Sequence, residues 1–232
     1  MQYGFPTTAS ILIGTRLLKL RQPYTTLAEA IEFEIEPIKH SRFIAYAQPV
    51  ESDEAAMAFI ESIRLLAPDA RHHCWAYALR QDSRVRFSDD GEPGGSAGQP
   101  MLRQVQGREL FDMAVVVIRY FGGTKLGVGG LMRAYGGAVG QLLDRASFKT
   151  ITPKLPLWLE YDYSDTTSVD MSLSTFDLTA SETLYGERVK ACLMIADEDV
   201  LSVYQSMQTQ VGGRITLTLP DELNSEVLTS KS

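Results

Sequence analysis

The feature that most constrains the fold is the run Met-Ala-Val-Val-Val-Ile-Arg-Tyr at residues 113–120 of the 232-residue chain. A strand with one face in solvent alternates apolar and polar residues, whereas a strand buried on both faces reads as a continuous apolar run. Residues 113–118 are all apolar, and four of them are β-branched. The chain is therefore predicted to contain a sheet in which this strand is central and buried on both faces.

The periodicity of apolar residues predicts further strands and helices around this central strand. Strands are expected at residues 31–35 and 43–50, joined by a tight connection, and at 72–79 and 85–87. Helices are expected from a cap at Ser52 or Asp53 to about residue 66, before Pro68, at 96–106 behind a capping box of Ser96 and Gln99, and at about 126–145. The many glycines of the last helix indicate that it approaches the sheet closely.

The chain after residue 153 has its own pattern of strands and helices. Residues 155–161 alternate strictly, and the following elements continue the order strand, helix, strand, strand, helix, strand to about residue 219. That order predicts a ferredoxin-like sandwich. The predicted fold class is α+β, with an extension at residues 1–26 and two domains at residues 27–152 and 153–232.

The two parts of the chain differ in charge, although the net charge of the whole is -7. Residues 1–150 contain 17 Lys and Arg against 16 Asp and Glu, which gives +1, whereas residues 151–232 contain 5 against 13, which gives -8. Any affinity of the first part for nucleic acid must therefore come from a local patch, and salt should weaken it. The acidic second part is expected to face protein or to repel RNA.

Cysteine content and apolar runs predict the compartment. Cys74 and Cys192 lie far apart in a chain long enough to need no disulfide, so free thiols in a reducing cytosol are expected. The apolar run at residues 9–14 is far shorter than the roughly 20 residues that span a bilayer, and the start lacks the basic segment of a signal peptide. We expect a cytoplasmic protein without membrane insertion.

A glycine-rich stretch follows the central strand and precedes a helix, as in sites that bind anions through backbone N–H groups. Its spacing does not match a P-loop, because Val128 stands where Lys-Ser or Lys-Thr is required, and Met132 stands where a dinucleotide fingerprint needs a small residue. His72, His73 and Cys74 lack a fourth ligand at a spacing typical of zinc sites. No cofactor and no metal are therefore predicted.

The residues predicted to contact nucleic acid surround this glycine loop. Positive charges and aromatic rings beside backbone amides suit phosphate contact combined with base stacking. The set comprises Arg71, His72, Arg119, Tyr120, Gly122, Gly123, Lys125 and Arg133, with Phe121 as a second ring. The alternative is that the rings are packed and the arginines are merely solvated.

A polar loop, Ser88-Asp89-Asp90-Gly91-Glu92, is a second candidate ligand site. Clustered carboxylates attract hard cations and raise one another's pKa, so Asp89, Asp90 and Glu92, together with His72, are candidates for a magnesium site or a general base. The alternative is an acidic turn that caps nearby backbone groups. Sequence spacing provides no triad geometry for Ser88, and no catalytic residue is assigned.

Three ordered motifs resemble those of the IMPACT/YigZ family. They are Arg71-His72-His73-Cys74, then Phe87 to Pro93 continuing through Gly98 to Leu102, then Val116 to Gly123 with Leu126-Gly127. The resemblance covers about residues 31–151 and implies a fold like the second domain of ribosomal protein S5 and domain IV of elongation factor G. For the residues after 153 it implies a ferredoxin-like domain similar to domain V of that factor.

This resemblance implies a non-catalytic nucleic-acid- or ribosome-binding factor that affects translation, with RNA or the ribosome as its partner. Eukaryotic members of the family restrain a translation-control kinase by occupying its activator, so a regulatory module with a protein partner is the second interpretation. The third is an enzyme that uses the Asp89, Asp90 and Glu92 loop on a small substrate. Whether this loop and the Gly122 loop converge on one surface would help to discriminate these interpretations.

Overall fold

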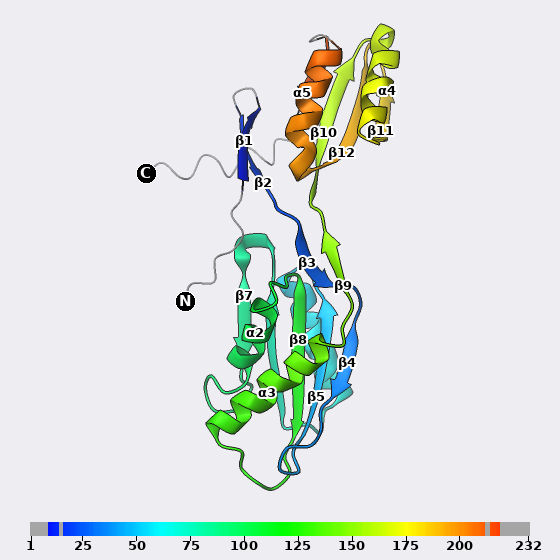
Figure 1. Ribbon diagram of the computed structural model, residues 1–232. Coiled ribbons are helices and arrows are strands. Elements are labelled where there is room, and N and C mark those ends of the chain that lie inside the picture. The colour runs from blue at the N-terminus through cyan, green and yellow to red at the C-terminus, as the bar shows by residue number, and fades with distance from the viewer. Residues whose placement is uncertain (1–8, 14–15, 212–213, 219–232) are drawn as a thin grey trace, which may run out of the picture. The chain divides into compact units, whose positions relative to one another are not determined.

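The structure, a computed structural model, describes residues 9–13, 16–211 and 214–218. Its fold class is α+β, as predicted, and neighbouring strands in its sheets run antiparallel. The chain divides into two compact units (Figure 1). Residues 24–151 form the body of the first unit, and the described residues from 152 onward form the second together with residues 9–13 and 16–23. In the part of the chain that is described, every helix is too short or too polar to cross a membrane.

The first unit is built on a five-stranded sheet with the order β4-β5-β8-β6-β7. Its strands are β4 (Ile31–Glu34), β5 (Arg42–Pro49), β6 (His72–Ala78), β7 (Val85–Ser88) and β8 (Met113–Tyr120). The prediction for β8 is confirmed, since β8 pairs with β5 on one side and β6 on the other, and residues 113–118 are at most 1% exposed. This burial on both faces produces two apolar clusters, one on each side of the sheet.

Helices cover both faces of this sheet (Figure 1). On one face, α1 (Asp53–Leu66) buries Phe59, Ile60 and Ile63. On the other face lie α2 (Gly98–Gln106) and α3 (Val128–Leu143). Of the two predicted caps, Ser52 and Asp53, it is Ser52 that caps α1, because its Oγ accepts a hydrogen bond from the N–H of Ala55 at 3.1 Å.

The predicted capping box at Ser96 is wrong. Helix α2 begins at Gly98, and its preceding residue, Ala97, provides no side-chain cap. Ser96 is fully buried, and its Oγ has no hydrogen-bond partner among the described residues. Asp89, eight and nine residues before the two N–H groups that it binds, caps this helix instead.

A second, two-stranded sheet in the first unit pairs β3 (Tyr24–Leu27) with β9 (Phe148–Ile151). Leu27 is fully buried, and Thr26 Oγ1 donates to the backbone oxygen of Asp112 at 3.0 Å. The expected extension at residues 1–26 therefore ends inside a strand of the first unit. Earlier in that segment, β1 (Ala9–Ile13) pairs with β2 (Arg16–Leu20).

The second unit has the strand and helix order predicted from its periodicity. Its elements are β10 (Lys154–Tyr161), α4 (Thr166–Thr175), β11 (Ala180–Tyr185), β12 (Val189–Ala196), α5 (Val200–Gln210) and β13 (Thr216–Thr218). The strands form one antiparallel sheet in the order β11-β12-β10-β13. Both helices contribute to a single apolar cluster with the inner face of this sheet.

Candidate nucleic-acid interface

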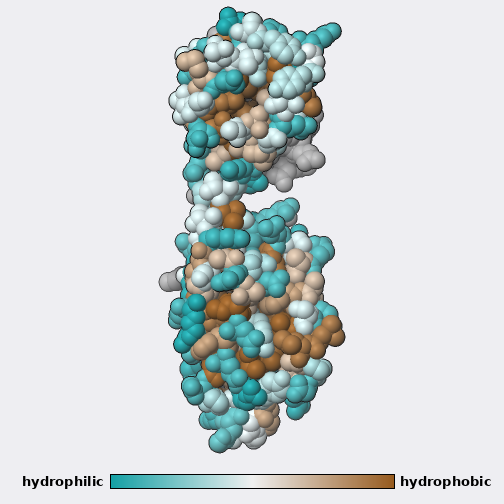
Figure 2. All heavy atoms as spheres, turned by 90° about the vertical axis from the view of Figure 1, so that its right-hand side faces the viewer, coloured by the Kyte–Doolittle hydropathy of each residue, from teal (hydrophilic) through white to brown (hydrophobic). Residues whose placement is uncertain are grey.

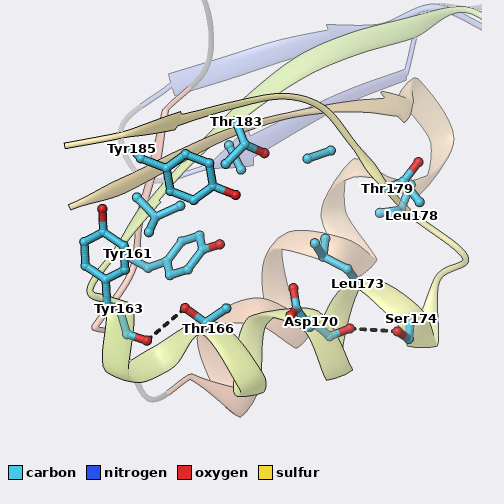
Figure 3. A pocket seen from close by; sticks show the side chains of 13 residues that line it. Tyr161, Tyr163, Thr166, Asp170, Leu173, Ser174, Leu178, Thr179, Thr183 and Tyr185 are labelled. Atoms are coloured by element: carbon cyan, nitrogen blue, oxygen red, sulfur yellow. Dashed lines mark hydrogen bonds between the residues drawn. The ribbon is translucent and has the colours of Figure 1, made fainter.

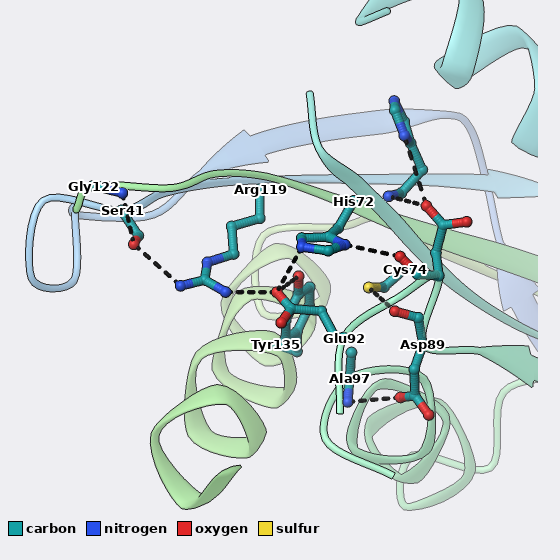
Figure 4. A network of polar contacts seen from close by, with 11 residues as sticks. Ser41, His72, Cys74, Asp89, Glu92, Ala97, Arg119, Gly122 and Tyr135 are labelled. Atoms are coloured by element: carbon teal, nitrogen blue, oxygen red, sulfur yellow. Dashed lines mark hydrogen bonds and ion pairs between the residues drawn. The ribbon is translucent and has the colours of Figure 1, made fainter. Parts of the chain in front are cut away.

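The candidate residues of the first unit meet at one end of its sheet. The register pairs Arg42 of β5 with Tyr120 of β8, and His72 of β6 with Arg119 of β8. The loop after β8, the start of β6 and the loop after β7 therefore leave the sheet at the same end. Figure 4 shows the side chains from these segments converging there.

Asp89 is the residue that caps α2. Its Oδ1 accepts hydrogen bonds from the backbone N–H groups of Ala97 and Gly98, both at 2.9 Å, and its Oδ2 accepts from Gly95 at 2.7 Å. A carboxylate at this position satisfies orphan donors of the helix and complements the helix dipole. Both oxygens of Asp89 are therefore engaged in holding its own loop.

Asp90 is likewise engaged within the chain. Its Oδ2 accepts from the backbone N–H of His73 at 2.7 Å, and its Oδ1 pairs with Arg64 at 3.0 Å. Its backbone oxygen accepts from Nδ1 of His72 at 2.8 Å, and its own N–H donates to Ser88 Oγ at 3.2 Å. The loop from Ser88 to Asp90 is thus fixed against β6.

The Cys74 thiol, next to this loop on β6, is buried and donates to the backbone oxygen of Asp89 at 3.0 Å. Burial raises the pKa of Cys74, which keeps the thiol protonated. A protonated, buried thiol is a poor nucleophile and a poor metal ligand. Cys74 is therefore a structural residue of the loop.

Glu92 and Arg119 form a buried ion pair, with 2.6 Å between Oε1 and the guanidinium nitrogen (Figure 4). The same Oε1 accepts from the hydroxyl of Tyr135 at 2.8 Å, and His72 Nε2 lies 4.0 Å away. Arg119 is only 6% exposed, and its guanidinium lies 5.4 Å from the ring centre of Phe121. Arg119, which the sequence placed among the residues that contact nucleic acid, is therefore buried and paired with Glu92 in the interior.

These contacts bear on the two interpretations of the acidic loop. A magnesium site needs carboxylate oxygens that are free to face the ion, whereas Asp89, Asp90 and Glu92 are bound to the chain's own donors. Among the described residues, no group of three or more His, Cys, Asp or Glu is placed to hold a metal ion. The geometry matches an acidic turn that caps nearby backbone groups.

The glycine loop after β8 is held close to the preceding hairpin. The N–H of Gly122 donates to Ser41 Oγ at 3.2 Å, and a Cβ added at Gly122 would lie 2.0 Å from the carbonyl carbon of His40. Only glycine fits this approach. Gly123 has a φ of 84°, in the region that favours glycine, and is exposed.

Two aromatic side chains at the end of β8 have different roles. The Tyr120 hydroxyl donates to Asp69 at 3.2 Å, and the Arg42 guanidinium lies 5.4 Å from its ring centre. Burial and the neighbouring Asp69 raise the pKa of Tyr120. Phe121, in contrast, is 48% exposed. Phe121 is therefore the ring with a surface free for stacking, and Tyr120 is half-packed.

The remaining basic residues of the predicted set are exposed. Arg71 precedes β6, Lys125 lies in the loop before α3, and Arg133 lies in the second turn of α3. Over residues 9–13, 16–211 and 214–218, none of the three has a carboxylate within ion-pair distance. The structure therefore divides the predicted set into the exposed cations and the internally bonded His72, Arg119 and Tyr120.

A groove of about 340 Å³ between α2 and α3 adds a residue that sequence reasoning missed. Arg103 of α2 and Arg133 of α3 both line it, together with Pro100, Gln104, Gly136 and Gly137. Helical periodicity places Arg103 opposite the buried Met101 and Val105, and thus in solvent. Only the packing of α2 on α3 brings Arg103 to the groove that Arg133 lines.

Comparisons with known proteins relate the chain to several others. A family model described as "Impact N-terminal domain" matches residues 39–143. The chain is 44% identical over 146 residues to "IMPACT family member YigZ" of Escherichia coli, covering 62% of this chain and 72% of that protein. It is 35% identical over 199 residues to "IMPACT family member" of Haemophilus influenzae, covering 84% and 96%.

Two further similarities extend over most of the chain. "IMPACT family member YvyE" of Bacillus subtilis is 33% identical over 192 residues, which cover 82% of this chain and 88% of that protein. A solved structure described as "Crystal structure of an hypothetical protein" has 34% sequence identity and a TM-score of 0.64, covering 88% of this chain and all of that one. The similarity therefore includes both units.

Proposed function

Because this chain belongs to the IMPACT family, we propose that its first unit binds the phosphate backbone of structured RNA as a non-catalytic factor acting on translation in the cytoplasm. The ribosome is the proposed source of that RNA. We further propose that the first unit is similar to the second domain of ribosomal protein S5, and that the second is ferredoxin-like. The antiparallel order β13-β10-β12-β11 supports the ferredoxin-like assignment.

The observation that carries the RNA proposal is the separation of charges at one end of the sheet. Lys125 and Arg133 are exposed beside the glycine loop, and Arg103 adds a third cation at the α2–α3 groove. The carboxylates of the neighbouring loop are meanwhile bound to Arg64, Arg119 and the N-terminus of α2. The exposed charge of this surface is therefore positive, although the first 150 residues sum to only +1.

The backbone at the start of α3 adds a second element that suits phosphate. The first N–H groups of α3 have no intrahelical partner, as in any α-helix, and the residue before the helix, Gly127, provides no side chain to cap them. Such groups bind anions together with neighbouring cations, and they do so without reading base sequence. The exposed ring of Phe121 provides a surface on which an unpaired base can stack.

The test measures the affinity of the full chain for an RNA hairpin from 50 to 300 mM salt. We expect the logarithm of the association constant to fall linearly with the logarithm of the salt concentration. Replacing Lys125, Arg133 or Arg103 by alanine should weaken binding and lower that slope by about 1 for each phosphate contact removed. The matched control is Lys149→Ala, which removes an exposed cation from β9, beyond the last turn of α3.

The same variants should have the same relative effects on binding to ribosomes. Sedimentation through sucrose gradients is expected to show co-migration with ribosomes at low salt. A variant in which Lys125, Arg133 and Arg103 are all replaced by alanine should lose this co-migration, and Lys149→Ala should retain it. Salt-insensitive binding, or an equal loss for Lys149→Ala, would show that the proposed surface is not the interface. Co-purification with a protein that survives nuclease treatment would instead favour the protein-interaction interpretation.

A further inference from the structure

A cavity of about 480 Å³ lies in the second unit between α4 and the strands β11 and β12 (Figure 3). This volume is within the roughly 300–1,000 Å³ typical of small-ligand sites. Figure 2 faces the side of this unit that carries α4 and β11 and shows apolar surface there, surrounded by hydrophilic residues. The cavity belongs entirely to one unit and is separate from the surface proposed to bind RNA.

Three tyrosines form one end of the cavity, with their rings close together in Figure 3. Tyr161 of β10 is buried, whereas Tyr163 is 53% exposed and Tyr185 of β11 is 76% exposed. The Tyr163 hydroxyl donates to the backbone oxygen of Gly186 at 3.0 Å, which fixes that ring against the turn between β11 and β12. The Tyr163 ring is therefore held in place without a ligand.

Helix α4 provides the polar wall. Thr166, Asp170 and Ser174 are spaced by four residues, so they lie on one face of the helix, and all three line the cavity. Among the described residues that line the cavity, Asp170 is the only charged one. Within the described residues, the Asp170 carboxylate has no ion-pair partner. Burial raises the pKa of Tyr161, and the nearby Asp170 and Tyr185 raise it further. This effect agrees with the position of all three side chains around one cavity.

The negative net charge of the second unit acts in the same direction as the carboxylate of Asp170. Residues 151–232 contain 5 Lys and Arg against 13 Asp and Glu, a sum of -8. Arg188, Lys190 and Arg214 each pair with a carboxylate of the same unit. The negative net charge of this unit would therefore repel an anionic ligand. A cation would be attracted by that net charge and could also pair with the carboxylate of Asp170.

Aromatic rings around a single carboxylate are suited to binding a guanidinium group. A guanidinium is planar, stacks on tyrosine rings and is weakly hydrated, and its N–H groups suit a carboxylate and several hydroxyl acceptors. The hydroxyls of Thr166, Ser174 and Thr183 surround the same space. We propose that this cavity is a binding site for a guanidinium group, supplied by an arginine side chain of a protein partner.

The exposure of the rim points to a polypeptide as the source of that group. Tyr163 and Tyr185 are half or more exposed to solvent, and Met171, next to the lining residue Asp170 on α4, is 68% exposed. A free metabolite would leave these side chains in water. A peptide backbone that passes over the rim would cover them, as large aromatic and apolar side chains are covered in interfaces.

The test titrates the full chain with a capped five-residue peptide that has arginine between two pairs of glycines. A second peptide contains citrulline, which keeps the shape of arginine and removes its charge. Nuclear magnetic resonance should show saturable shifts of α4 and β11 resonances with the arginine peptide and at least tenfold weaker binding of the citrulline peptide. Asp170→Asn should weaken the binding of the arginine peptide at least tenfold.

The matched control is Asp199→Asn, which removes the same charge from an exposed position outside the cavity. We expect it to change the affinity less than twofold. Equal binding of both peptides, an equal effect of the two variants, or the lack of saturable binding would overturn the proposal. If arginine amide alone binds as tightly as the peptide, the assignment to a protein partner is overturned.

Discussion

Arg119 and Glu92 bring opposite charges together inside the first unit, where their side chains are 7% and 5% exposed. Removing two charges from water costs several kcal/mol, which is offset only when the pair has good geometry and further hydrogen bonds. Glu92 has the Tyr135 hydroxyl as a second donor, and the Arg119 guanidinium lies 5.5 Å from the ring centre of Phe43. The pair thus connects the loop after β7 with β8 and α3.

This arrangement predicts a large stability loss for Glu92→Gln. Removing the carboxylate leaves the Arg119 charge buried without a counter-charge, and breaking such pairs costs about 3–5 kcal/mol. We expect about 3 kcal/mol, because the glutamine oxygen still accepts a hydrogen bond. Urea unfolding followed by circular dichroism measures this loss in the free energy of unfolding.

The control for this prediction is Glu34→Gln, which breaks the exposed pair between Glu34 and Arg42. Exposed pairs contribute about 0.2–1 kcal/mol, so this variant should lose much less stability. If both variants lose less than about 1 kcal/mol, the Arg119 charge reaches water and is available to a ligand after all.

At the scale of elements, the two loops of the candidate site are held by contacts with residues outside them. Asp89 caps α2 from the preceding strand end, and Gly122 lies against the backbone of His40 and Ser41. A backbone approach this close has no room for a Cβ. The position of the basic loop before α3 therefore depends on one glycine.

Two glycine variants test this dependence. Gly122→Ala would place its Cβ within 2.4 Å of three backbone atoms and should destabilise the first unit by at least about 1–3 kcal/mol. Gly137→Ala, in α3, meets no atom within 4 Å and should stabilise the helix by up to about 1 kcal/mol. Thermal and urea unfolding measure both. Equal effects of the two changes would contradict the packing described for Gly122.

At the scale of the whole molecule, the apolar clusters stay within the two units. Two clusters lie on either side of the first sheet, and a third lies between the second sheet and its helices. A unit with its own core can fold alone. The first unit also needs β3, since Leu27 is fully buried and the Tyr24 hydroxyl bonds to Asp112.

Fragments of the chain test this organisation. We expect residues 24–151 to unfold cooperatively as an isolated fragment, with both faces of the sheet covered. A fragment of residues 28–151 lacks β3 and the buried Leu27, and it should be less stable by about 3 kcal/mol or more. Urea unfolding of the two fragments measures the difference. Equal stability would place β3 outside the folded core.

Short stretches of sequence were sufficient to predict the elements that depend on local patterns. The apolar run of β8, a helix capped at Ser52 or Asp53 and the element order of the second unit could all be predicted from the sequence, because strand and helix periods act over a few residues. The family resemblance likewise rested on local motifs. β3 was missed because its four residues carry little periodic signal of their own.

Only the tertiary structure decided which of the candidate side chains are free. Arg119 binds a carboxylate 27 residues away, Asp89 caps a helix eight or nine residues after it, and Arg103 lines one groove with Arg133 through helix packing. The residue types named by the sequence were compatible with ligand contact and with internal bonding alike. The choice between ligand contact and internal bonding depends on the free energy of burying each side chain and on partners elsewhere in the chain. A short stretch of sequence does not show either of them.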